Sequence, residues 1–343
     1  MTAGCATVKS GEKTQLQQNK SVNVQNVNDS NVITLVGDIM TGRKLSQLID
    51  VNGSGYPYTK VKALFKQSSV VFANLEAPLV NKESLSNLKK QGKDKAVHLF
   101  GFERDAGAMA EAGINIVSLG NNHILDYGQY GLTQTVQALE KTGIDYCGIR
   151  INNLWKPNVP CVKYVNGTKV SFLCYSNVSH ETFFAGKDRY GTIPALMDEI
   201  QKDIKAYRQD TDILIVYLHW GKEYEEVKNY QKKFARKLID SGADFVFGSH
   251  THLFQDVEKY KGKFIFYGIG NFVFDLERED SHKSGAINFE IVDKKISEVK
   301  LIPVKLVDYR PEIMKDSAEI KAFIDGLKFE GIEPEELGIL TEK

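Results

Sequence analysis

From Asn31 onward, short apolar runs alternate with longer stretches of helical periodicity. Apolar runs of this length, bounded by Gly, Asn, Asp or His, are typical of strands, and the periodic stretches are typical of amphipathic helices. Strands are predicted over residues 32–36, 70–73, 114–119, 170–175, 213–218, 245–247 and 264–269, and helices over residues 104–112, 133–142, 196–208 and 230–241. Several runs lack internal alternation, as expected of strands buried on both faces. The pattern predicts a layered α/β domain.

The pattern of predicted secondary structure changes after Gly285. Two β-rich runs over residues 286–292 and 296–304 predict a hairpin, and the tail from Ile313 has the pattern of a charged amphipathic helix. We therefore divide the chain into a flexible tether over residues 1–31, one main domain over residues 32–310 and a helical tail over residues 311–343.

Polar residues follow the predicted strands at the point where each strand ends. Carboxyl ends of strands are the edge of an α/β sheet where ligands bind, so these side chains are expected to converge. They are Asp38, Asn74, Glu76, Asn121, Asn122, His123, His219, His250, His252 and Asn271. Carboxylates, carboxamides and imidazoles suit zinc, manganese or iron, and thiolates are absent from the set. The pattern predicts a divalent metal site with one or two ions.

Each of these residues also has an ordinary structural explanation. Asp38 could cap a helix, Glu76 could pair with Arg43, Asn122 could hold a left-handed turn, and His219 could be a hydrogen-bonded core histidine. Taken together, these explanations require independent coincidences.

Six motifs in this order resemble the CapA (PgsA) family of poly-γ-glutamate capsule biosynthesis proteins, which is related to the calcineurin-like metallophosphoesterases. The motifs are Val36-Gly37-Asp38-Ile39-Met40-Thr41-Gly42-Arg43, Asn74-Leu75-Glu76-Ala77-Pro78-Leu79, Gly120-Asn121-Asn122-His123-Ile124-Leu125-Asp126-Tyr127-Gly128, His219-Trp220-Gly221, Gly248-Ser249-His250-Thr251-His252 and Gly270-Asn271-Phe272-Val273-Phe274. The resemblance extends from about residue 32 to residue 304 and implies a four-layer α/β/β/α sandwich of the metallo-dependent phosphatase type.

The resemblance also implies a role for each polar residue. It implies that Asp38 and His252 bind a first metal and that Glu76 bridges two metals. The second metal would be held by Asn122, His219 and His250.

Two further residues receive catalytic roles from the resemblance. His123 would donate a proton to a leaving group, and Asp126 would orient its imidazole.

The chain departs from the superfamily pattern at the first metal. The usual Asp-x-His is Asp38-Ile39-Met40, and Glu76 replaces the usual bridging aspartate. The thioether of Met40 is a poor ligand for a hard or borderline metal ion. The first metal site is therefore expected to be weak, empty or differently built, which argues against a full two-metal mechanism.

Three residues near the strand ends are candidates for substrate binding or for supporting the site. The guanidinium of Arg43 offers paired donors to a carboxylate or phosphate, with a plain salt bridge as the equal alternative. Glu223 and Asn271 are the other two candidates.

Charge and cysteine content exclude some classes of function. Lys plus Arg and Asp plus Glu number 44 each, so no basic excess exists to bind a nucleic-acid backbone. Cys147, Cys161 and Cys174 have no metal-binding spacing and are expected to be buried free thiols.

The first residues carry a weak targeting signal. Ala3-Gly4-Cys5 resembles a bacterial lipoprotein cleavage box, and residues 6–31 are rich in Asn, Gln, Ser and Lys. The expectation is an extracytoplasmic, cell-surface protein that meets the membrane only through a lipid anchor at Cys5.

These observations favour a metal-dependent hydrolase of the cell envelope that acts on an anionic polymer such as poly-γ-glutamate, at a phosphoester or amide linkage. One alternative is a non-catalytic, polymer-binding accessory subunit of a membrane synthase and export complex. Another is a stand-alone cytosolic phosphodiesterase. Since similar folds host different chemistries, the resemblance names the pathway better than the bond cleaved.

Overall fold

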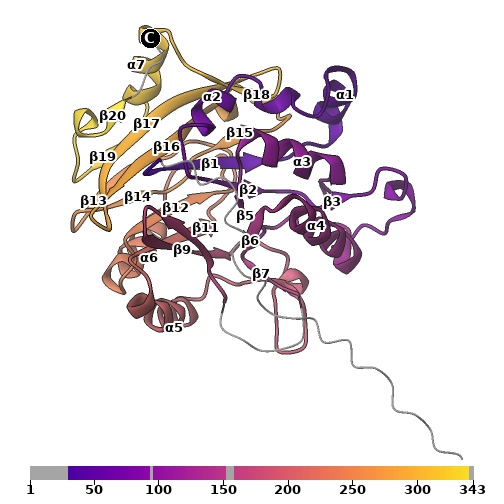
Figure 1. Cartoon of the computed structure of the whole chain (residues 1–343), viewed down its shortest axis with the longest axis horizontal. Coiled ribbons are helices and arrows are strands. Elements are labelled where there is room, and N and C mark those ends of the chain that lie inside the picture. Colours follow the sequence, from indigo (N-terminus) through magenta and orange to yellow (C-terminus); the bar gives the residue numbers. More distant parts are fainter. Residues whose placement is uncertain (1–29, 93–95, 152–157, 340–343) are drawn as a thin grey trace, which may run out of the picture.

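The computed structural model describes residues 30–92, 96–151 and 158–339. The predicted tether, with Cys5, lies outside these residues except for Ser30 and Asn31. Two large sheets lie face to face, with helices on the outer side of each (Figure 1). The predicted four-layer α/β/β/α sandwich is thereby confirmed.

The first sheet has nine strands. Its path runs β18 (Arg310–Ile313), β17 (Lys295–Val307), β16 (Lys283–Val292), β1 (Val32–Ile39), β2 (Val70–Leu75), β5 (Ile116–Ser118) and β6 (Asp145–Cys147). β15 (Asn271–Val273) pairs in parallel with β1, and β20 (Gly338–Ile339) pairs in parallel with β17. β1, β2, β5 and β6 are parallel, whereas β16 to β18 are antiparallel. The predicted hairpin is β16 and β17.

The second sheet has seven strands. They are ordered β19 (Phe329–Glu330), β13 (Val257–Tyr260), β14 (Lys263–Phe266), β12 (Phe245–Ser249), β11 (Ile213–His219), β9 (Thr168–Ser176) and β8 (Cys161–Val165). The central strands β14, β12, β11 and β9 are parallel. Two small two-stranded sheets join β3 (Leu79–Val80) to β4 (Gly101–Phe102) and β7 (Ile149–Arg150) to β10 (Gly191–Thr192).

Helices cover the outer face of each sheet. The first sheet is covered by α1 (Arg43–Asn52), α2 (Lys62–Phe65), α3 (Glu103–Ala112) and α4 (Gly128–Thr142), and the second by α5 (Met197–Tyr207) and α6 (Asn229–Asp240). Short 3₁₀ turns occupy Tyr56–Tyr58, Leu85–Asn87, Glu181–Phe183, Arg208–Asp210, Glu279–His282 and Pro334–Glu336. Among the described residues, no helix has both the length and the apolar character of a membrane span.

Strand burial follows from these layers. Phe72 of the first sheet contacts Phe172 and Phe247 of the second, with ring centroids 5.4 and 5.0 Å apart. Val36 and Ile39 face the helices on the other side of β1. Each central strand therefore buries both faces, which explains the apolar runs without alternation.

Residues 311–343 contain more than the expected helix. α7 (Ser317–Asp325) is present, and its Phe323 packs against Phe254 with ring centroids 5.3 Å apart. β18 and β20 pair with β17, and β19 pairs with β13. The segment thus contributes strands to both sheets.

Candidate metal centre

Asp38 lies at the carboxyl end of β1 and is fully buried. The strand approaches β15 so closely here that a Cβ atom on Gly37 would lie 1.8 Å from the carbonyl oxygen of Gly270. Only glycine fits this position. The chain therefore brings Asp38 beside the start of β15, in register with Asn271.

Three donors hold the Asp38 carboxylate. Asn74 Nδ2 donates to Oδ1 over 2.8 Å, Ser249 Oγ donates to the same oxygen, and the backbone N of His250 donates to Oδ2 over 3.2 Å. Burial raises the pKa of Asp38 above its ordinary value, while His252 and these hydrogen bonds act in the opposite direction. A cation at this site would favour the ionised form in the same way.

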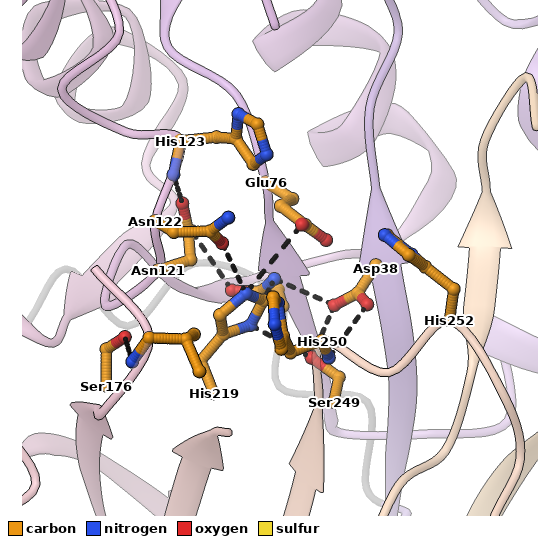
Figure 2. A network of polar contacts seen from close by, with 12 residues as sticks. Asp38, Glu76, Asn121, Asn122, His123, Ser176, His219, Ser249, His250 and His252 are labelled. Atoms are coloured by element: carbon orange, nitrogen blue, oxygen red, sulfur yellow. Dashed lines mark hydrogen bonds and ion pairs between the residues drawn. The ribbon is translucent and has the colours of Figure 1, made fainter. Parts of the chain in front are cut away.

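Two groups of buried side chains have the geometry of metal ligands (Figure 2). One is Glu76, His219 and His250, and the other is Asp38, Glu76 and His252. Within each group the ligand atoms lie within 4.8 Å of one another. Glu76 belongs to both groups, so its carboxylate lies between two candidate positions for a cation.

Asn122 adds a fourth donor to the first of these groups. Its Oδ1 lies 2.9 Å from Nε2 of His219, and this same nitrogen lies 3.7 Å from Oε1 of Glu76. Carboxylate, imidazole and carboxamide donors without thiolates suit a borderline divalent cation such as zinc, manganese or iron. The residues present therefore fit a divalent metal.

Neighbouring polar groups orient the imidazoles. Nδ1 of His252 donates to Oδ1 of Asn271 over 2.8 Å. Nδ1 of His219 lies 3.1 Å from the hydroxyl of Tyr217 and 3.3 Å from Oγ of Ser249. Such partners fix the tautomer and ring orientation of metal-binding histidines, which leaves Nε2 for the cation.

The loop after β12 is strained at both of its histidines. His250 has a φ of 96° and His252 a φ of 59°, in the region that favours glycine. Strained backbone of this kind clusters at functional sites, where the surrounding structure maintains it.

His123 and Asp126 form a buried pair beside Asn122. Nδ1 of His123 lies 2.8 Å from Oδ2 of Asp126, which also accepts a hydrogen bond from the backbone N of Leu99 over 2.6 Å. Asn121 accepts from the backbone N of His123 over 3.0 Å and donates to Leu75 O over 2.8 Å. This segment is therefore anchored to the end of β2.

Met40 does not take part in either group of ligands. It is buried in an apolar cluster with Ala77, Leu99, Phe274 and Leu306, and its Sδ accepts a hydrogen bond from the backbone N of Gly42 over 3.1 Å. The three side chains Asp38, Glu76 and His252 come together without a ligand from position 40.

The three candidates for substrate binding, Arg43, Asn271 and Glu223, differ in their surroundings. Nε of Arg43 donates to Asp275 over 2.9 Å, so Arg43 forms a salt bridge, which was the alternative to a role in substrate binding. The partner in this salt bridge is Asp275 and not Glu76. Asn271 is fully buried, with its Oδ1 hydrogen-bonded to the candidate ligand His252 and its Nδ2 donating to Ser281 O. Glu223 is exposed on the loop after β11.

Asn74, Tyr217 and Ser249 contact the candidate ligands. Asn74 was expected among the polar residues at the strand ends, whereas Tyr217 and Ser249 were not predicted as site residues. Asn74 is the last residue but one of β2 and Ser249 the last residue of β12, so both lie at carboxyl ends of strands, which is the signal that marks them. Cys147, Cys161 and Cys174 are buried and free, as expected.

Known proteins resemble this chain in sequence and fold. The capsule biosynthesis protein CapA of Bacillus anthracis is 30% identical over 290 residues, covering 83% of this chain and 70% of the relative. The PGA biosynthesis protein CapA of Bacillus subtilis is 29% identical over 293 residues, covering 85% and 76%. A Staphylococcus aureus structure, provisionally assigned as a 5′-nucleotidase and solved with α-ketoglutarate, matches with a TM-score of 0.50 at 15% identity, covering 86% of this chain and 58% of that one.

A family model described as bacterial capsule synthesis protein PGA_cap matches residues 32–276, which include every residue of the candidate metal centre. The match confirms the resemblance drawn from the six motifs. The chain therefore belongs to the PGA_cap family of bacterial capsule synthesis proteins.

Proposed function

We propose that this protein is a metal-dependent hydrolase of capsule or poly-γ-glutamate biosynthesis that acts outside the cytoplasm on an anionic polymer of the cell envelope. The bond cleaved is a phosphoester or an amide. One observation carries the proposal: Glu76 is common to two groups of buried candidate ligands. The hydrogen-bonded pair of His123, the residue after Asn122, and Asp126 supports it.

The residues that would hold the metals are those of the two groups. Asp38, Glu76 and His252 would hold one cation, and Glu76, Asn122, His219 and His250 the other. A divalent cation in such a site supplies a Lewis acid for phosphoryl or carbonyl oxygens and lowers the pKa of water.

His123 is suited to move a proton. Its Nδ1–H is donated to Asp126, so in the protonated imidazole Nε2–H is the proton available to a leaving-group oxygen or nitrogen. After the transfer the ring is neutral and keeps its hydrogen bond to Asp126, whose carboxylate fixes the tautomer. The pair is 6% and 0% exposed, which limits competition from bulk water.

The names of the relatives support the pathway. The Bacillus proteins are described as capsule and PGA biosynthesis proteins, and we extend this setting to the present chain. Poly-γ-glutamate is then the first polymer to test, with anchoring through Cys5 and contact with a membrane synthase or export complex as further expectations.

Met40 favours a second candidate function. At this position the superfamily pattern has a histidine, and here the side chain packs into an apolar cluster. A first metal held by only three side chains suits a cleft that binds polymer without cleaving it, as in an accessory subunit.

The two functions separate in one experiment. Protein purified without chelators is analysed for metal and assayed on bis(p-nitrophenyl) phosphate and on poly-γ-glutamate. The hydrolase predicts turnover that His123→Gln reduces at least about 10²-fold with polymer binding unchanged. Metal and polymer binding without turnover on either compound would instead identify the accessory function.

A further inference from the structure

The loop between β11 and α6 brings an aromatic residue to the metal centre. The ring of Tyr224 lies 5.6 Å from the ring of His252, centroid to centroid, with an angle of 32° between the planes. The guanidinium carbon of Arg278 lies over the same tyrosine ring, 4.6 Å from its centroid. The half-buried ring thus contacts both a candidate metal ligand and a cation.

The backbone of Tyr224 is in an unfavourable conformation. Its φ of 60° lies in the left-handed region, which a tyrosine rarely adopts. The backbone N of Tyr224 donates to Thr251 O over 2.9 Å, and Gln255 Nε2 donates to the carbonyl of the next residue, Glu225, over 2.8 Å. The loop is therefore fixed to the segment that carries the two strained histidines, and strain maintained by its surroundings points to a role at the site.

Charged groups lie around the Tyr224 side chain. Burial raises the pKa of Tyr224, the carboxylates of Glu223 and Glu76 raise it further, and Arg278 lowers it.

Arg278 is positioned to keep the ring in place. Its Nε and Nη2 donate to the two carboxylate oxygens of Asp280 over 2.6 and 2.7 Å, which fixes the guanidinium plane. About half of the Arg278 side chain is exposed, so the pair lies at the rim of the site.

We infer that Tyr224 is a substrate-contacting residue of this site, whose phenol donates a hydrogen bond to an oxyanion of the substrate, and that Arg278 is the positioning residue that holds its ring. This inference rests on the proposed function. The ligand class is an oxyanion such as a phosphoryl group, and the phenol O–H is the donor.

Binding of inorganic phosphate tests the inference without relying on turnover. Manganese-loaded wild type, Tyr224→Phe and Tyr230→Phe are titrated with phosphate by calorimetry, and the metal content of each is measured. Tyr230 is an exposed tyrosine on α6 and is the matched control. Loss of one hydrogen bond to a charged group predicts that Tyr224→Phe binds phosphate about tenfold more weakly, or weaker still, with metal content unchanged and Tyr230→Phe like wild type.

The outcomes distinguish this inference from the function on which it rests. Wild type that binds phosphate no more tightly than Tyr224→Phe overturns the role of Tyr224 and leaves the metal-dependent function standing. Manganese-loaded wild type that does not bind phosphate also overturns the inference, whereas the proposed function fails only if turnover is absent on both the phosphodiester and poly-γ-glutamate. Arg278→Gln is expected to weaken phosphate binding by a smaller factor, and to have no further effect in the Tyr224→Phe background. An equal loss in both backgrounds would overturn the positioning role.

Discussion

His123 donates a hydrogen bond from Nδ1 to Oδ2 of Asp126 over 2.8 Å, and neither side chain has more than slight exposure. The proposed proton donor therefore has a fixed tautomer. Asp126→Asn is expected to lower kcat at least about 10²-fold, because an amide at this position no longer requires Nδ1 to carry the proton. The measurement is kcat and KM on a small phosphodiester, with metal content as the control. A variant with normal kcat would show that Asp126 does not orient the acid.

Asn271 accepts a hydrogen bond from His252 at the candidate metal centre. Asn271→Ala removes the acceptor of the His252 Nδ1 hydrogen bond and is expected to weaken metal binding about 10- to 100-fold. Asn271→Asp keeps an acceptor and is expected to bind metal more tightly than the alanine variant. Both values come from competition with a metal-sensitive dye. Wild-type affinity in the alanine variant would contradict the supporting role.

Met40 is a core residue in this account. Met40→Leu conserves volume and is expected to cost less than about 1.5 kcal/mol in the free energy of unfolding, with the metal content unchanged. Met40→Ala is expected to cost about 2 to 5 kcal/mol, again without loss of metal from the folded protein. Urea unfolding and elemental analysis check the two expectations. Loss of metal in the leucine variant would identify the thioether as a ligand.

The raised pKa of Asp203 predicts that the stability of the protein depends on pH. Burial raises its pKa from the ordinary 3.8 to about 6, although it accepts a hydrogen bond from Tyr175 over 2.9 Å. Between pH 4 and 6 the native state therefore binds more protons than the unfolded state at this residue, so its contribution to stability falls as the pH rises. Asp203→Asn keeps the acceptor and is expected to be about 1 to 2 kcal/mol more stable than wild type at pH 7, with no gain at pH 4.

Urea unfolding at the two pH values measures this difference. Asp198→Asn, which replaces an exposed residue on the same helix, is the matched control for loss of a carboxylate from this helix. A gain for Asp203→Asn that is equal at both pH values would contradict the assignment.

The strand ends were the part of the site that sequence could predict. In parallel strands the carboxyl ends share one edge, so a polar residue after each apolar run marks that edge without any knowledge of the contacts. Asp38 and His219 were found in this way. The same signal also marked Asn271, but it could not distinguish a residue that faces the cleft from one that supports a ligand from behind.

Parts of the fold lacked a local signal. β19 and β20 have two residues each and pair with strands more than 30 residues away, so they have no periodicity to detect. α4 begins at Gly128, whereas the sequence predicted a start at residue 133. The prediction began late because the glycines at 128 and 131 interrupt the helical pattern of the first turns. β14 ends at Phe266 instead of residue 269. Gly268, which follows the strand, lies so close to Gln255 that an added Cβ would be 2.8 Å from its side-chain oxygen.

The salt bridge of Arg43 shows a further limit. Its partner Asp275 is 232 residues away and follows β15, which lies beside β1 only in the folded chain. Long-range pairing of this kind depends on the sheet order.

Glu76 is the residue on which both proposed metals depend. Glu76→Gln keeps the size of the side chain but removes the charge shared by the two ligand groups, so both metals are expected to be lost or strongly weakened. Glu223→Gln removes one exposed carboxylate near the site and is expected to retain full metal content.

The most direct test is an anomalous difference map from crystals grown with manganese, collected for wild type and Glu76→Gln. Two peaks are expected in wild type, one on each side of the Glu76 carboxylate, with a marked loss of both in the variant. Peaks away from Glu76, or no bound manganese in wild type, would contradict this expectation.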